Sequence, residues 1–376
     1  MSGDELAAVR EVGALAAAHA AKSEAARRLP DEVVAAIVAA GFPRHFVARR
    51  WGGTEGGFGD YLAASAALAE HDPSAAWVAS IVASLGRMAA YLPEPAQHAL
   101  WAEGPDAFLA CALVAGGTAR AVSGGWRVSG GWRYLSGVHF AAWALVACPV
   151  PLPDGTEQVR FLLVPRSAYT VEDTWFAVGM RATGSDGIRL EEVFVPEEFS
   201  FARADLIDGR APESAPASSA VPLKAVSGLS FAGPVLGAAK GALREFVRLV
   251  AAGRAGGGPA HRVQGGNDVS AELAIARAAG EVDAARLLLD RAAADADRGV
   301  CGEHDVARLA RDHALAADLL ASTVAGLFRL TGTSAHDREA PLQRFWRDVT
   351  TAAGHAVLRF EPAARAYARL VVEGCR

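Results

Sequence analysis

The amino-acid sequence predicts an α+β fold, in which an N-terminal helical domain and a C-terminal four-helix bundle flank a central antiparallel β barrel or sandwich. In the first hundred residues apolar side chains recur every three or four positions, which is typical of helices. Short apolar and β-branched runs between Gly-Gly pairs follow, and long Ala-, Leu- and Arg-rich stretches complete the chain. We therefore expect three domains within the 376 residues, at 1–105, 106–200 and 201–376.

Four or five helices are expected in the N-terminal domain. The first carries an apolar stripe at helical spacing, formed by Leu6, Val9, Val12 and Leu15. Pro30 precedes a run of good helix formers and indicates the start of another helix. Asp72 or Ser74 is expected to cap a later helix that continues to Tyr91, because short oxygen-bearing side chains bond the free N–H groups of a first turn.

The central domain is expected to consist of short antiparallel strands. Ser123-Gly124-Gly125-Trp126 is repeated six residues later as Ser129-Gly130-Gly131-Trp132, and both Gly-Gly pairs predict hairpin turns, which often need positive φ. Further strands are indicated at Ala141–Cys148, Val159–Val164 and Ile188–Val195.

Four long helices are expected in the C-terminal domain, at Ser230–Ala252, Val269–Ala294, Asp305–Leu330 and Pro341–Val372. Their lengths exceed the ordinary mean of ~11–12 residues, and Ala-rich faces allow the close contacts of a bundle. The Ala-, Pro- and Ser-rich segment Asp208–Ala220 predicts a flexible or covering loop.

Composition and charge exclude several classes of function. A formal charge of −5 without any long basic run argues against nucleic-acid binding. The longest stretch without charge, residues 134–153, contains Gly137 and three prolines, so no membrane span is expected. The N-terminus lacks the apolar segment of a secretory signal. Four scattered cysteines predict reduced thiols in a cytoplasm, and the histidines show no metal-ligand spacing, so no metal site is expected; the cysteines are Cys111, Cys148, Cys301 and Cys375.

Three local strings point to a family. The first is Trp132-Arg133-Tyr134-Leu135-Ser136-Gly137, and the second is Asp173-Thr174-Trp175 followed by the string from Gly179 to Ser185. The third runs from Pro341 to Asp348 and is followed by His355. With their order along the chain, these strings resemble the acyl-CoA dehydrogenase superfamily over essentially the whole sequence. The third resembles its two-component flavin-dependent monooxygenases, which include aromatic hydroxylases, a thiophene sulfur oxygenase and sugar nitrososynthases.

The resemblance separates oxygenation from acyl-CoA oxidation. Dehydrogenases of this superfamily commonly carry their catalytic base in a Tyr-Glu-Gly string, nine residues after an arginine. Here Ala356 stands nine residues after Arg347, and His355 stands where the monooxygenases carry a catalytic histidine. The resemblance thus implies oxygenation of an organic substrate with O2 and reduced FMN or FAD, through a C4a-hydroperoxyflavin.

Two catalytic residues are implied by this resemblance. Ser136 would be the hydroxyl beside the flavin N5, and His355 would be the imidazole near the peroxide. Histidine suits this role because its unperturbed pKa of ~6.5 allows proton exchange near neutral pH. Each residue also has an ordinary interpretation: Ser136 as turn chemistry before a glycine, and His355 as a core or interface residue of an Ala-rich helix.

Other cofactor contacts are implied as well. Tyr134, Leu135 and Trp175 would be apolar walls that exclude water. Arg254 would reach the flavin phosphates from a neighbouring subunit, or would simply be a helix C-terminal charge before glycines. Gly332 would lie in a turn that contacts flavin across a subunit boundary, or would be a helix C-cap.

Substrate and partners complete the expectations. Many hydroxylases of this branch carry a histidine on the substrate side where this chain has Leu85, which disfavours a simple phenol and favours a larger apolar or polycyclic substrate, or an amine. No GxGxxG unit for a nicotinamide is present, so a separate flavin reductase is expected. A cytoplasmic homotetramer and a tailoring step in secondary metabolism are further expectations. A flavin dehydrogenase or oxidase for a carrier-bound or other non-CoA substrate, and a scaffold without flavin, remain as alternatives.

Overall fold

Six helices build the N-terminal part of the protein, seen in a computed structural model that describes residues 3–152, 154–254, 268–299 and 302–375. Asp72 caps α5 by accepting a 2.8 Å hydrogen bond from the Ala75 N–H, which confirms one of the two expected caps. α5 is buried along most of its length and packs against α4, α9 and β1, so it lies at the centre of the molecule. The helices are α1 (Gly3–Ala18), α2 (Ala20–Ala26), α3 (Asp31–Ala39), α4 (Phe58–Ala69), α5 (Pro73–Ala89) and α6 (Glu94–Leu100).

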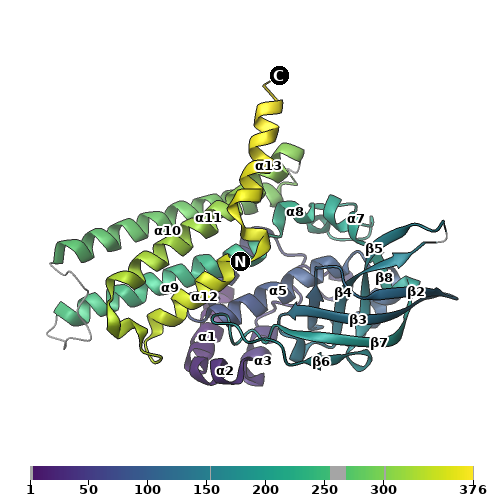
Figure 1. The fold of residues 1–376 in the computed structure, drawn as a ribbon, viewed down its shortest axis with the longest axis horizontal. Helices are drawn as coiled ribbons and strands as arrows, with labels where there is room; N and C mark the ends of the chain where they lie inside the picture. Colours follow the sequence, from purple (N-terminus) through teal and green to yellow (C-terminus); the bar gives the residue numbers. More distant parts are fainter. Residues whose placement is uncertain (1–2, 153, 255–267, 300–301, 376) are drawn as a thin grey trace.

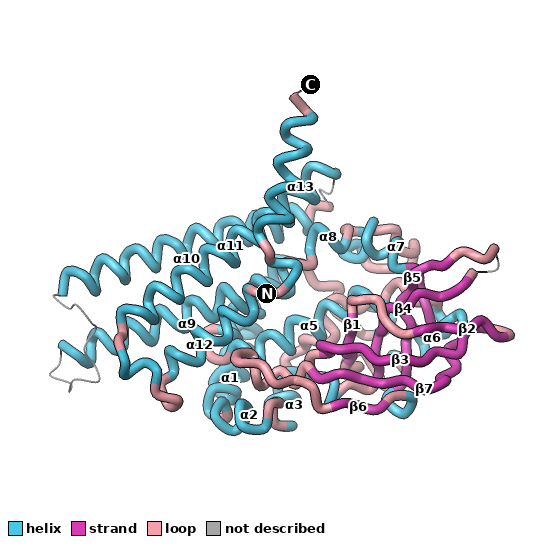
Figure 2. The backbone as a smooth tube through the Cα atoms, viewed as in Figure 1, coloured by secondary structure: helices cyan, strands magenta, loops and turns pink. Residues whose placement is uncertain are grey.

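Two four-stranded sheets follow and gather at one end of the molecule (Figure 2). Their strand orders are β1-β4-β5-β8 and β2-β3-β7-β6. The expectation of a wholly antiparallel domain is wrong at one pair, because β1 and β4 are parallel. The chain leaves β1, forms the β2–β3 hairpin in the other sheet and returns in the same direction, as a crossover allows. The strands are β1 (Leu109–Ala112), β2 (Thr118–Val122), β3 (Gly125–Leu135), β4 (Trp143–Pro151), β5 (Glu157–Pro165), β6 (Thr170–Glu172), β7 (Asp186–Pro196) and β8 (Ser200–Ala202).

The two Gly-Gly pairs have different structures. Gly124, with φ of +78°, lies in the expected turn between β2 and β3. Gly130, with φ of +148°, lies inside β3 at a shift in the register with β7, so the second pair forms a bulge and no turn. A Cβ at Gly130 would lie 2.4 Å from the Cα of Gly117. The second repeat thus reflects a close approach of two backbones, which sequence spacing alone does not reveal.

The C-terminal region contains the expected bundle, formed by α9, α10, α11 and α12, which run side by side away from the strands (Figure 1). The fourth helix is shorter than predicted, because the chain leaves the helix at Gly354 and α13 projects from the body (Figure 1). Within one continuous helix, the ring of Pro362 would clash with the preceding turn, whereas it is tolerated in the first turn of α13. The helices are α7 (Arg203–Asp208), α8 (Leu223–Val226), α9 (Leu229–Arg254), α10 (Asp268–Asp297), α11 (Glu303–Leu330), α12 (Pro341–Ala353) and α13 (Phe360–Glu373), with a short 3-10 turn, η8 (Ala356–Leu358), before α13.

The segment Asp208–Ala220 covers α5, which is the second of the two expected alternatives. The Arg87 Nε–H donates to the carbonyl of Ser218 over 2.8 Å, and the Tyr91 hydroxyl donates to the carbonyl of Ser219. Ser219 is completely buried. These bonds hold the segment against α5 over the end of the helix that carries Arg87.

Two further expectations concern membranes and cysteines. Among the described residues, α11 is long and apolar enough to cross a membrane, and its packing against α9, α10 and α12 accounts for its apolar face. Cys111, Cys148 and Cys375 are free thiols, whereas Cys301 lies outside the described residues.

Candidate active site

A cavity of about 470 Å³ lies where α5, the end of β3, the loop before β7, the start of α9 and the end of α12 meet. Five predicted site residues from four separate parts of the chain border it: Leu85, Tyr134, Ser136, Trp175 and His355. Its walls are mostly apolar, and the charged side chains that border it are Arg87 and Arg133. No Asp or Glu of the described residues lines it. From the described part of the chain, the cavity therefore offers hydroxyls, indoles and an imidazole, but no carboxylate base.

Ser136 lies at the centre of a buried row of polar side chains. Its Oγ accepts a hydrogen bond from the Trp77 indole N–H over 3.1 Å and lies 2.7 Å from Ser185 Oγ. Ser185 Oγ in turn lies 2.6 Å from Thr183 Oγ1, and the Thr183 hydroxyl donates to the Met180 carbonyl over 2.9 Å. The ordinary interpretation of Ser136 as turn chemistry does not describe these contacts, since its hydroxyl joins two other segments of the chain, α5 and residues 180–185.

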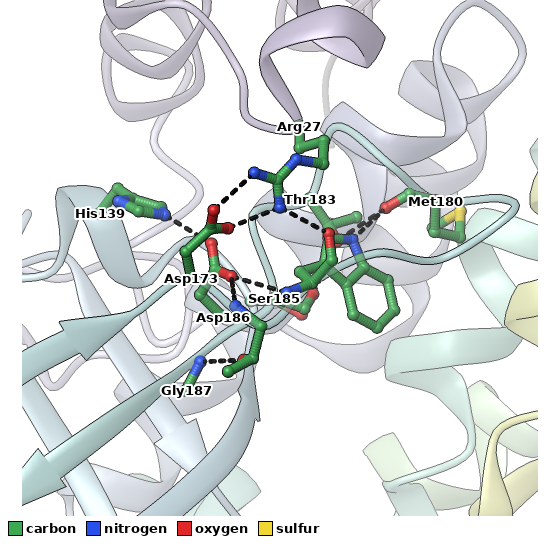
Figure 3. A network of polar contacts seen from close by, with 11 residues as sticks. Arg27, His139, Asp173, Met180, Thr183, Ser185, Asp186 and Gly187 are labelled. Carbon is green, nitrogen blue, oxygen red and sulfur yellow. Dashed lines mark hydrogen bonds and ion pairs between the residues drawn. The ribbon is translucent and has the colours of Figure 1, made fainter.

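Trp175 is held at the cavity by a network shown in Figure 3. Its indole N–H donates to the Met180 carbonyl over 3.0 Å. The buried Asp186 Oδ1 accepts the backbone N–H groups of Thr174 and Trp175 over 2.7 and 2.8 Å, and its Oδ2 bonds His139 Nε2 over 2.7 Å. A carboxylate that accepts two consecutive backbone N–H groups restrains the backbone between them, so Asp186 holds the chain at Thr174 and Trp175.

An arginine clamp lies beside this network. The guanidinium of Arg27, at the end of α2, donates to both carboxylate oxygens of Asp173 over 2.6 and 2.8 Å (Figure 3). It also donates to the Trp175 carbonyl over 3.1 Å. Arg27 has φ of +56°, a left-handed conformation that ends α2 and turns the side chain toward the loop. The N-terminal domain thus fastens the Trp175 loop.

His355 lies in the break between α12 and η8, and not inside a long Ala-rich helix as expected. Its ring stacks on Phe231 and meets Trp77 edge-on. Its Nδ1 accepts the Val357 backbone N–H over 3.3 Å, which places the proton of the neutral ring on Nε2. Burial lowers the pKa of His355 to about 4. This lowered pKa departs from the expected proton exchange near neutral pH and favours a neutral N–H donor, while the catalytic role of His355 stays a prediction.

The α12 end of the site is also fastened to the Trp175 loop. Asp348 Oδ1 accepts the Met180 backbone N–H over 2.5 Å, and Arg347 Nη1 donates to the Val178 carbonyl over 2.6 Å. Burial, with the nearby charges of Asp72 and Glu24, raises the pKa of Asp348 to about 7, although the bond from the Met180 N–H and the charge of Arg347 act in the opposite direction. Asp348 thus holds the backbone N–H of Met180 in place.

Three predicted cofactor contacts lie away from the cavity within this chain. Leu135 is completely buried in the core, because β3 turns successive side chains to opposite faces and Tyr134 faces outward. Arg254, at the end of α9, forms a 2.8 Å ion pair with Glu272 of α10, and the glycines at 256–258 lie outside the described residues. Gly332 lies in the turn after α11, with φ of +67°. The wall assigned to the Leu135 side chain is wrong, whereas the inter-subunit roles of Arg254 and Gly332 remain predictions.

The residues present suit a bound isoalloxazine ring. Tyr134 and Val114 are 62% and 77% exposed at the edge of the cavity, so apolar surface is left for a planar ring to cover. The Ser136 hydroxyl reaches the same space as the Trp175 side chain. Thr183, Ser185, Asp186 and Phe231 were missed as site residues from the sequence; the hydroxyl-rich string 183–186 was the available signal for the first three.

Comparisons with known proteins agree with this geometry. Residues 229–360 match the family described as acyl-CoA dehydrogenase, C-terminal domain. The oxygenase subunit HsaA of a flavin-dependent monooxygenase from Mycobacterium tuberculosis is 32% identical over 349 residues, which cover 89% of this chain and 86% of HsaA. The oxygenase component of an FADH2-dependent resorcinol hydroxylase from a Rhizobium species is 32% identical over 361 residues, covering 91% and 87%.

Solved structures show the same fold. The crystal structure of HsaA from M. tuberculosis superposes with a TM-score of 0.90 at 29% identity, covering 98% of this chain and 97% of that one. XiaF from a Streptomyces species, solved with FADH2 and glycerol, has a TM-score of 0.86 at 28% identity, covering 97% and 94%. The predicted α+β fold is confirmed. The chain belongs to the acyl-CoA dehydrogenase-like oxygenase components of two-component flavin-dependent monooxygenases.

Proposed function

We propose that this oxygenase component takes reduced FAD or FMN from a separate reductase and oxygenates a large apolar, polycyclic substrate in the 470 Å³ cavity. The observation that carries the proposal is that the Ser136 hydroxyl and a neutral His355 line one cavity that no described carboxylate lines. Removal of an α-proton, as in acyl-CoA oxidation, needs a base at the reacting carbon. The names and ligands of the relatives, FADH2 in the resorcinol hydroxylase and in XiaF, support the choice of cofactor.

The proposal of an apolar substrate is based on the residues around Leu85 in the cavity. Leu85 lies there among aromatic and aliphatic side chains, including Phe46 and Met88. The Tyr61 hydroxyl donates to Ser80, and the Ser84 hydroxyl donates to the carbonyl of Ile81 over 2.8 Å. Polar groups already bonded within the protein offer little to a substrate hydroxyl, so apolar contact dominates recognition.

Near Leu85, one charged side chain, that of Arg87, also lines the described part of the cavity. Arg87 is 2% exposed and donates to the carbonyls of Ser218 and Val221. These bonds fasten Arg87 to the end of the covering segment Asp208–Ala220. The guanidinium is therefore used within the protein to stabilise the cavity wall. A polycyclic substrate without a charged group fits this wall.

The positions of the lining residues suggest a role for each of them when a flavin is bound. A reduced flavin supplies the electrons and the site of reaction with O2 when it is bound. Trp175 and Tyr134 would border the ring and Ser136 would face its polar edge, while His355, with its ring proton on Nε2, lines the same cavity. Phe231, Leu85 and Met88 exclude water on the substrate side, which strengthens each hydrogen bond inside.

Two features of context are part of the proposal. A homotetramer would bring Arg254 and Gly332 of neighbouring copies toward each cavity. The apolar side chains of α10, with Leu273 and Leu287 67% and 70% exposed, support burial of that surface against another copy. A tailoring step in cytoplasmic secondary metabolism is consistent with a cavity suited to polycyclic compounds.

The proposal is tested by anaerobic titration with reduced FMN and reduced FAD, followed by mixing with oxygenated buffer in a stopped-flow instrument. We expect bound reduced flavin to reoxidise more slowly than free flavin, through a species that free flavin does not form. The His355→Ala variant should lose both the species and the slower reoxidation. Reoxidation at the rate of free flavin would contradict the proposal. Tight binding of oxidised flavin, with bleaching by a substrate under anaerobic conditions, would instead support the dehydrogenase alternative, and no binding in either state would support the scaffold.

A further inference from the structure

The hydroxyls of Ser136, Ser185 and Thr183 form a chain whose proton positions can be assigned by counting. Each hydroxyl has one proton to donate and two lone pairs to accept with. The Thr183 hydroxyl donates its single proton to the Met180 carbonyl. In the 2.6 Å contact between Ser185 and Thr183, the proton must then come from Ser185.

The same count fixes the direction of the next bond. Because the Ser185 proton is directed to Thr183, the 2.7 Å bond between Ser136 and Ser185 carries the proton of Ser136. The Trp77 indole N–H donates to Ser136 Oγ from the other side. In this order Ser136 has no proton left for the cavity and presents a lone pair to it.

The opposite order is equally complete. If the Thr183 hydroxyl turns toward Ser185, Ser185 donates to Ser136 and the Ser136 proton turns into the cavity. The Met180 carbonyl still accepts the Trp175 indole N–H over 3.0 Å and the Thr183 backbone N–H over 3.2 Å. A carbonyl has two lone pairs, so losing the third donor leaves it satisfied. Three C–O bond rotations interconvert the orders, and no proton leaves its oxygen.

We propose that Thr183 and Ser185 are positioning residues that set the polarity of Ser136 toward the flavin N5, by reversing this hydroxyl chain. The proposal rests on the proposed function, which places the flavin in this cavity. N5 of reduced flavin carries a proton and is a donor, whereas N5 of oxidised flavin is an acceptor. The order that ends on Met180 gives the donor a lone pair, and the reversed order gives the acceptor a proton. The chain thus lets one serine bond both redox states.

The chain can be fixed in one order by removing its far end. In Thr183→Val the Ser185 proton has lost its acceptor and can only go to Ser136, which leaves the Ser136 proton facing the cavity. The N5–H of reduced flavin then meets a proton and not a lone pair. We expect the ratio of Kd for reduced flavin to Kd for oxidised flavin to rise about fivefold, the equivalent of one ordinary hydrogen bond. Anaerobic and aerobic fluorescence titrations of the same protein give both constants without turnover.

A second substitution should leave this effect in place. In Thr183→Val/Ser185→Ala the Ser136 hydroxyl has lost Ser185 Oγ as an acceptor, so its proton still faces the cavity and the ratio should stay within about twofold of the raised value of Thr183→Val, well inside the weight of one hydrogen bond. Thr183→Ser keeps the hydroxyl and should keep the original ratio. Thr323→Val is a matched control, because Thr323 is a buried threonine of α11 that bonds Glu281 and Leu319, outside the residues that line the cavity.

The outcomes separate the two levels of the proposal. An unchanged ratio in Thr183→Val, with both flavin states bound, would overturn the hydroxyl chain and leave the proposed function standing. The same would follow if the double variant returned to the ratio of the unmodified protein. If the unmodified protein bound neither reduced nor oxidised flavin, the proposed function and the chain would both be overturned. Should Thr183→Val fail to fold, Thr183→Ala removes the same hydroxyl without adding a methyl group and carries the same expectation.

Discussion

The imidazole of His355 lies against the ring of Phe231, with centroids 3.9 Å apart and an interplanar angle of 26°. Phe231 belongs to the first turn of α9, and His355 belongs to the break after α12. The contact therefore joins the start of one bundle helix to the end of another at the cavity. With the Val357 N–H bonded to Nδ1, the stacking leaves little freedom to the ring. The direction of Nε2 is therefore set by the fold.

Replacing His355 should reduce the rate of substrate oxygenation. Because His355 stays neutral near pH 6.5, its titration should produce no inflection there in the pH–rate profile of the unmodified protein. With a pKa of about 4, the imidazole is neutral above that pH, and it becomes a cation only as the pH falls through about 4. His355→Ala removes the Nε2–H donor, and we expect kcat for substrate oxygenation to fall by about 10²-fold or more. Phe231→Leu keeps the imidazole and should cost less. A pH–rate profile with an inflection near 6.5 that disappears in His355→Ala would contradict the neutral donor.

Asp186 is expected to control the Trp175 loop. Asp186→Ala leaves the N–H groups of Thr174 and Trp175 without their acceptor. Each unpaired buried group costs about 1–3 kcal/mol, so Tm should drop and flavin should bind more weakly. Asp154→Ala is the matched control, since Asp154 accepts the Thr156 N–H in an exposed hairpin turn. Thermal melts and flavin titrations that did not distinguish the two variants would refute this role.

Introducing a histidine at position 85 should create affinity for simple phenols. Leu85 lines the cavity and is 2% exposed, so Leu85→His presents an imidazole to the substrate side. One hydrogen bond contributes about 0.5–1.5 kcal/mol, which corresponds to a roughly 2–10-fold lower Kd for a phenol. Met88→His is the control, because Met88 also lines the cavity. Equal phenol binding by both variants, measured by calorimetry, would show that position 85 is not special.

His313 should weaken the fold at acidic pH. It is 1% exposed, neither ring nitrogen has a hydrogen-bond partner among the described residues, and burial lowers its pKa to about 4. As the pH falls below ~6.5, the unfolded chain takes up this proton first. The unfolding free energy should therefore decrease between pH ~6.5 and about 4, by up to ~3 kcal/mol.

Substitution isolates this contribution. His313→Leu removes the titrating group, so its unfolding free energy from urea melts should fall less steeply over the same pH range. His98→Leu, at a histidine whose side chain is 66% exposed, should leave the slope unchanged. If His313→Leu and the unmodified protein lost stability in parallel, another group would be responsible.

Much of the fold was predictable from local pattern. The cap at Asp72 and the three long helices α9, α10 and α11 follow from residues close to one another in the chain. The parallel pairing of β1 with β4 was not predictable in this way, because strand direction depends on a connection through the other sheet. Pro362 did carry a signal that the last helix must break, since a proline is tolerated only near a helix start.

Some features of the candidate site were likewise predictable from the sequence, and others depended on the tertiary structure. Motif strings alone identified Ser136, Trp175 and His355, and with them the family, because their order along the chain is a one-dimensional property. The protonation of His355 and the role of Asp186 depend on burial and on contacts between distant segments, which only the tertiary structure decides. The two possible proton orders of the hydroxyl chain likewise arise from Trp77, Ser136, Ser185 and Thr183 meeting in space. Residue type determines which groups can donate a proton, and packing determines where each proton points.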